Sequence, residues 1–86
     1  MRILYYNIEN VSYKVEAKLV EKKYNAVRIK VYEQDKYLGT RLLFIPFECS
    51  YAEIGEQIKA GLLSIVTEHE GRQRLVNFFN GPDIDN

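Results

Sequence analysis

The chain offers few side chains that could do chemistry, and the first is its only histidine, His69, which stands between Glu68 and Glu70. A histidine beside a carboxylate can serve as a general base, and a cysteine such as Cys49 can serve as a nucleophile beside a histidine. Such a pair needs a third residue to orient the base, and none can be named. The pattern therefore predicts a protein without catalytic residues.

Metal and cofactor chemistry has equally little support in the sequence. Asp83 and Asp85 resemble the start of a calcium loop, but the glycine and glutamate that complete such a loop do not follow. One cysteine provides neither an internal disulfide nor a cysteine-only metal cage. Because phosphate-binding glycine loops and dinucleotide fingerprints are also missing, we expect neither a cofactor nor a metal.

Composition limits the class of protein. The chain has 86 residues, 47% of them hydrophobic, and its 12 basic and 12 acidic side chains give a net charge of zero. This length suits one domain, and a neutral total disfavours a protein that wraps duplex nucleic acid. No run approaches the ~20 apolar residues of a membrane span, and the first residues alternate like a strand rather than a signal peptide. We therefore expect a cytoplasmic protein without a membrane partner.

Alternation of apolar and polar residues predicts four strands, over residues 2–8, 11–20, 25–33 and 37–47. Short turns at residues 9–10 and 34–35 and a three-residue loop at 22–24 would join them as an antiparallel β-meander. The loop lengths place Leu19 opposite Val27 and Val31 opposite Leu38.

A helix is predicted after the strands. Ser50 and Glu53 have the spacing of a capping box, and Gly71 is a natural helix stop. An apolar stripe between them would cover the sheet, with Gly61 beside it allowing a close approach: Ile54, Ile58, Leu62, Ile65 and Val66. The prediction is thus an α+β domain over residues 1–80, of order ββββα, followed by a flexible tail at 81–86. Residues 72–79 fit either a short strand or one or two helical turns.

The outer face of this sheet is the most distinctive surface that the sequence predicts. It gathers basic side chains and tyrosines, opposite a sheet face lined by Leu38, Leu42 and Phe44. The predicted outer-face residues are Tyr5, Lys14, Lys18, Arg28, Lys30, Tyr32, Tyr37 and Arg41. Tyrosines between cations could stack the bases of a single-stranded nucleic acid. Alternatively, the face is solvated, with lysine stems packed over tyrosine rings, or it binds a protein.

An apolar patch is predicted near the edge of the same face. Leu43 and Ile45 would be exposed there unless Phe78 and Phe79 fold back over them or a second copy of the chain covers them. We therefore expect a non-enzymatic binding domain that acts on another protein or on itself as a homodimer. Single-stranded nucleic acid is the alternative partner.

Overall fold

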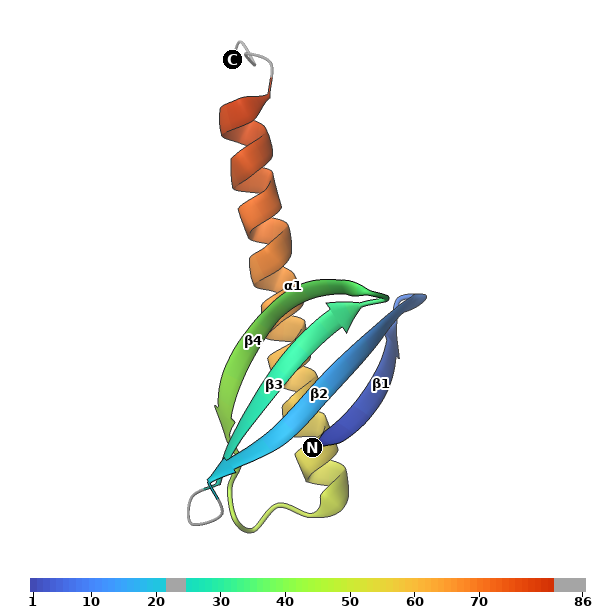
Figure 1. Cartoon of the computed structure of the whole chain (residues 1–86), viewed down its shortest axis with the longest axis vertical. Helices are drawn as coiled ribbons and strands as arrows, with labels where there is room; N and C mark the ends of the chain where they lie inside the picture. The colour runs from blue at the N-terminus through green and yellow to red at the C-terminus, as the bar shows by residue number, and fades with distance from the viewer. Residues whose placement is uncertain (22–24, 82–86) are drawn as a thin grey trace.

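The computed structural model describes residues 1–21 and 25–81. The chain forms strands β1 (Arg2–Ile8), β2 (Val11–Glu21), β3 (Ala26–Glu33) and β4 (Lys36–Phe44), followed by helix α1 (Tyr51–Asn80). The four strands pair with their sequence neighbours in one antiparallel sheet, in the order β1-β2-β3-β4. Figure 1 shows the helix crossing one face of this sheet, so the predicted α+β meander with one helix is confirmed.

The β1–β2 hairpin has the predicted register and turn. Leu4 lies opposite Val15 and Tyr6 opposite Tyr13. Glu9 and Asn10 form the two-residue turn with positive φ angles of 51° and 66°, the backbone that matches the twist of a hairpin. This register turns the even-numbered residues of β1 towards the helix.

The β2–β3 pairing also follows the prediction, with Ala17 opposite Ile29 and Leu19 opposite Val27. The predicted loop at 22–24 lies outside the described residues. Parity between the strands places Val15, Ile29 and Val31 on the helix face, where all three are fully buried.

The β3–β4 pairing differs from the prediction because β4 contains a bulge. The turn lies at Gln34–Asp35 as expected, with Tyr32 opposite Tyr37, but Val31 then pairs with Gly39 instead of Leu38. Leu38 is the extra residue, and one extra residue reverses the facing of every residue after it. The rest of β4 is therefore inverted relative to the prediction, with Gly39, Arg41 and Leu43 on the helix side.

Helix α1 begins as predicted but ends later. The Ser50 side chain accepts a hydrogen bond from the Glu53 amide, and the Glu53 carboxylate accepts one from the Ser50 amide, which completes the capping box. The predicted stop at Gly71 is wrong, because the helix continues to Asn80 and residues 72–79 are helical. An interior glycine costs a helix only about 1 kcal/mol. The stop comes instead at the extended Gly81, which precedes a proline.

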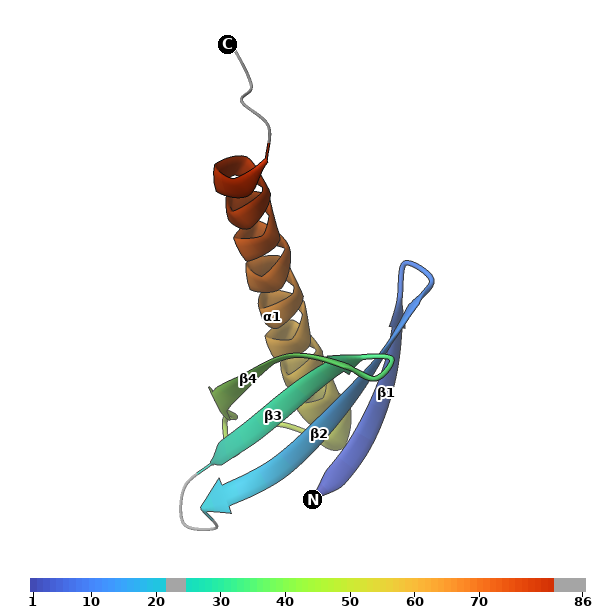
Figure 2. The same cartoon turned by 45° about the horizontal axis from the view of Figure 1, so that its top comes forward.

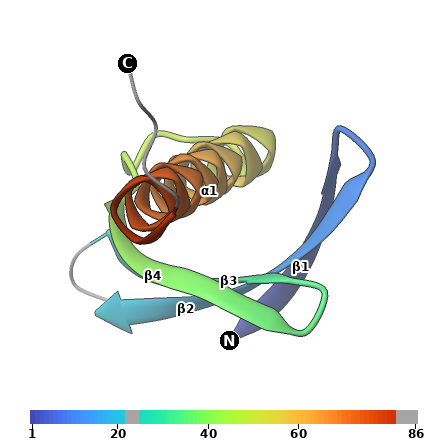
Figure 3. The same ribbon diagram turned by 90° about the horizontal axis from the view of Figure 1, so that it is seen from above.

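The core lies between the sheet and the first half of α1. Three residues of α1 are buried against the sheet: Ile58, Leu62 and Ile65. The predicted close approach at Gly61 is confirmed, since a Cβ there would lie 2.9 Å from side-chain atoms of Ile29 and Leu43. Figure 3 shows the helix seated on the concave face of the curved sheet.

The C-terminal part of α1 extends beyond the sheet (Figures 1 and 2). Thirty residues make a helix of about 45 Å, longer than the face it crosses. Every residue from 72 to 80 is exposed. We call residues 72–80 the α1 overhang.

Candidate functional site

The first row of the predicted outer face is present in the structure. Tyr5, Lys14, Tyr32 and Tyr37 lie side by side across the four strands. The Lys14 ammonium sits 4.7 Å from the centroid of the Tyr32 ring, and the Tyr32 and Tyr37 rings are 5.6 Å apart at a tilt of 60°. Tyr32 is half-buried between these neighbours, whereas Tyr5 and Tyr37 are exposed.

A second group of outer-face cations surrounds a shallow hollow. Lys18 lies opposite Arg28, and Glu16 lies opposite Lys30. Together with Met1 these side chains line a cavity of about 230 Å³. Lys14 forms an ion pair with Glu16 at 3.7 Å, so part of the positive charge of this face is already compensated.

Arg41 does not belong to this face, and its predicted place there is wrong. The bulge turns it to the helix side, where its guanidinium lies 2.5 Å from the Glu68 carboxylate on α1. Hydrogen bonding to Arg41, together with its charge, lowers the pKa of Glu68 below its usual value. Arg41 therefore ties the edge strand to the helix.

The predicted edge patch is also wrong in part. Ile45 is buried, and Leu43 packs against the core beside Gly61. The first half of α1 covers both side chains, whereas Phe78 and Phe79 lie in the overhang. The expected exposed group of four therefore divides into two covered and two exposed residues.

The same inversion exposes two side chains that were predicted to be buried. Leu42 is 48% exposed and Phe44 is 65% exposed on the outer face. Sequence reasoning missed them because a hairpin without a bulge was the simplest register. Gly39 was the available signal: a Cβ at this position would lie 3.1 Å from Ile65, a close approach that marks the helix side.

The α1 overhang exposes four large apolar side chains. Phe78 is 65% exposed and Phe79 is 75% exposed, and their rings meet edge to face at 5.2 Å. Leu75 and Val76 are exposed beside them. Contiguous exposed apolar surfaces are typical of interaction sites.

The two residues considered for catalysis, Cys49 and His69, are far apart in the structure. Cys49 precedes α1 and His69 lies 18 residues beyond Tyr51, a distance of about 27 Å along a continuous helix. Because the helix continues to Asn80, His69 lies in the interior of α1. Burial, followed by the nearby Glu53 and Glu48 carboxylates, raises the pKa of the Cys49 thiol, which disfavours the reactive thiolate.

The described part of the chain contains no group of three or more His, Cys, Asp or Glu residues that could hold a metal ion. The predicted acidic pair at residues 83 and 85 lies outside it, as do residues 82–86 of the predicted tail. Its one helix is not apolar enough to cross a membrane. Comparison with protein families, curated proteins and solved structures finds no match, so function has to be inferred from these surfaces.

Proposed function

We propose that this protein is a non-enzymatic interaction module that associates with a second copy of itself through the α1 overhang. The observation that carries the proposal is the exposure of four apolar side chains in the part of α1 that lies beyond the sheet: Leu75, Val76, Phe78 and Phe79. Burying them would yield roughly 25 cal/mol for each Å² of apolar surface removed from water. The overhang of a second copy has the same apolar side chains, so the two overhangs can bury each other.

The total surface supports one additional interface. The chain exposes 6825 Å², whereas a compact monomer of 10.1 kDa exposes about 5,300 Å². The excess is about 1,500 Å², and a standard interface covers about 800 Å² on each partner. The excess is therefore large enough for one dimer contact.

An antiparallel arrangement lets the apolar side chains of two overhangs meet. If the two helices cross at Asn77, Leu75 of each copy faces Phe79 of the other. The same contact then occurs twice across a two-fold axis, as an isologous interface requires.

Light scattering coupled to gel filtration tests this proposal. The wild-type protein should have the mass of a dimer, and Phe78→Ser/Phe79→Ser should have the mass of a monomer. The matched control is Phe44→Ser/Phe47→Ser, which removes two phenylalanines of similar exposure (65% and 78%) far from the overhang. The control should remain a dimer.

A wild-type protein that stays monomeric at high concentration would remove the self-association proposal.

Single-stranded nucleic acid remains a second candidate partner, through the outer sheet face. The exposed rings of Tyr5 and Tyr37 and the cations around the hollow favour it. In that case Tyr5→Ala should cost about 1–3 kcal/mol of binding free energy, and Arg28→Ala should lower the salt dependence by about one counterion. Titration of labelled single strands at low salt is the measurement, and no binding at micromolar protein would eliminate this candidate.

A further inference from the structure

The two edges of the sheet differ in their protection against further strand pairing. The β4 edge carries Lys36, Arg41 and the bulge at Leu38, which are the features that keep natural sheet edges from pairing. β1 has an uninterrupted register over all seven of its residues. Its only charged side chain is Arg2, at its first position. The β1 edge is therefore open to another strand.

The hairpin geometry fixes which backbone groups of β1 are available. In a two-residue hairpin the pair beside the turn exchanges both backbone hydrogen bonds, here Ile8 with Val11. Alternate residues then direct their N–H and C=O groups to the free edge, namely Ile3, Tyr5 and Asn7. No loop in residues 1–21 or 25–81 forms a backbone hydrogen bond to them.

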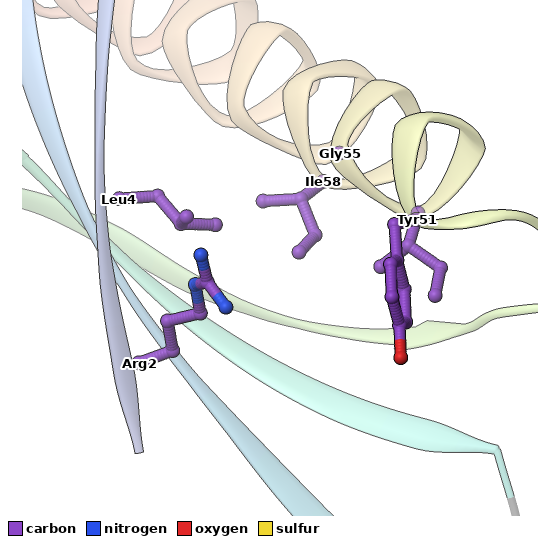
Figure 4. Close-up of a pocket in the computed structure, with 6 residues that line it drawn as sticks. Arg2, Leu4, Tyr51, Gly55 and Ile58 are labelled. Carbon is purple, nitrogen blue, oxygen red and sulfur yellow. The ribbon is translucent and has the colours of Figure 1, made fainter.

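A cavity lies beside this open edge, on the helix side. It has a volume of about 270 Å³, and its lining residues come only from β1 and the first turns of α1: Arg2, Leu4, Tyr51, Ile54, Gly55 and Ile58. Figure 4 shows the Arg2 guanidinium and the Leu4 side chain entering the space below the helix. Because no residue of β2, β3 or β4 lines it, the cavity lies where an added strand would direct its inward side chain. A dry cavity of about 150 Å³ holds a benzene ring, so a bulky apolar side chain fits here.

Gly55 leaves this cavity open, although a larger side chain at this position would not collide with any neighbouring atom. A Cβ built at Gly55 has no atom within 4 Å, in contrast to the crowded Gly61. A glycine inside a helix costs stability relative to alanine, and here no close approach compensates for that cost. Its carbonyl oxygen accepts a hydrogen bond of 3.0 Å from the Tyr6 hydroxyl, which joins the helix to β1 along one side of the cavity.

We propose that the β1 edge binds an extended segment of another protein as a fifth strand. An apolar side chain of that segment fills the cavity, and an acidic side chain two residues away meets Arg2. The acidic group is expected because Arg2 has no ion-pair partner among the described residues. A second copy of β1 fits less well, since the strand Arg2–Ile8 carries no carboxylate. The backbone bonds supply affinity and the cavity supplies side-chain selectivity. This site is separate from the overhang.

Two synthetic peptides probe the site, one for each strand direction. Acetylated and amidated Thr-Val-Thr-Leu-Thr-Asp-Thr places its leucine opposite Leu4 and its aspartate opposite Arg2 in an antiparallel pairing, and Thr-Asp-Thr-Leu-Thr-Val-Thr does so in a parallel one. Titrated up to about 1 mM, one of them should shift the amide resonances of Ile3, Tyr5 and Asn7 and slow their hydrogen exchange. Replacing its leucine by serine should weaken binding at least tenfold.

Protein variants separate the cavity from the strand edge. Gly55→Leu fills the cavity and should weaken peptide binding at least tenfold, while the melting temperature stays equal or rises. The matched control is Gly71→Ala, which makes a similar gain in helix propensity and should bind the peptide unchanged. Tyr5→Pro removes one outward N–H and should also abolish binding, whereas Tyr5→Thr should retain it.

The proposal is overturned if neither peptide shifts the β1 amides at 1 mM. It is also overturned if the Gly55→Leu protein binds as tightly as wild type, or if the serine peptide binds as well as the leucine peptide. Melting curves identify a variant that fails to fold. If Tyr5→Pro does not fold, Gly55→Leu still tests the proposal.

Discussion

Leu62 carries more of the packing between α1 and the sheet than its exposed neighbours. It is fully buried in the core cluster with Ile58 and Ile65. Leu62→Ala should lower the free energy of unfolding by about 2–5 kcal/mol, because it leaves a cavity that the sheet cannot close. Lys59→Ala, on the same helix but outside the core cluster, should change it by less than about 0.5 kcal/mol. Urea denaturation compares the two, and equal losses would contradict the helix face described here.

Two carboxylates stabilise α1, Glu53 in its capping box and Glu68 through its ion pair with Arg41 of β4. Both make the stability of the protein depend on pH. Hydrogen bonds from Ser50 lower the pKa of Glu53, and Arg41 lowers that of Glu68. A lowered folded-state pKa stabilises the fold fully above the ordinary carboxyl pKa of about 4.3. This contribution is lost as the pH falls through the lowered value. The melting-temperature difference between wild type and Glu68→Gln should therefore shrink between pH 6 and pH 3.

Glu56→Gln is the control for this pH dependence, because Glu56 is exposed and forms no ion pair among the described residues. Its difference from wild type should show no comparable shrinkage. A Glu68→Gln difference that stays constant with pH would show that the ion pair with Arg41 does not stabilise the fold.

The whole molecule combines a small packed body with a helix end, the α1 overhang, that lies beyond the sheet. Its radius of gyration is 15.7 Å, against about 12 Å for a compact chain of this length. If the overhang dimerises, the melting temperature of wild type should rise with protein concentration, because association stabilises only the folded state. The melting temperature of Phe78→Ser/Phe79→Ser should not depend on concentration. A wild-type melting temperature independent of concentration would contradict dimerisation.

Local patterns in the sequence predict the elements of this protein and the pairing of its first three strands. Period-two alternation located four strands, and turn residues such as Asn10 set the first register. The Ser50–Glu53 capping box located the start of α1, and Gly61 indicated the close approach to the sheet. Each of these features depends on residues a few positions apart, so it can be predicted from the sequence.

The register of β4, the length of α1 and therefore the exposed surfaces depend on contacts that local patterns do not predict. The bulge at Leu38 brings Gly39 beneath Ile65 and Arg41 to Glu68, contacts between residues far apart in sequence. Gly71 has an ordinary stop signal that a continuing helix overrides at a cost of only about 1 kcal/mol. One inserted residue inverts a strand face and one tolerated glycine extends a helix. The register of a strand and the end of a helix can therefore depend on packing between distant residues, which a local sequence pattern does not show.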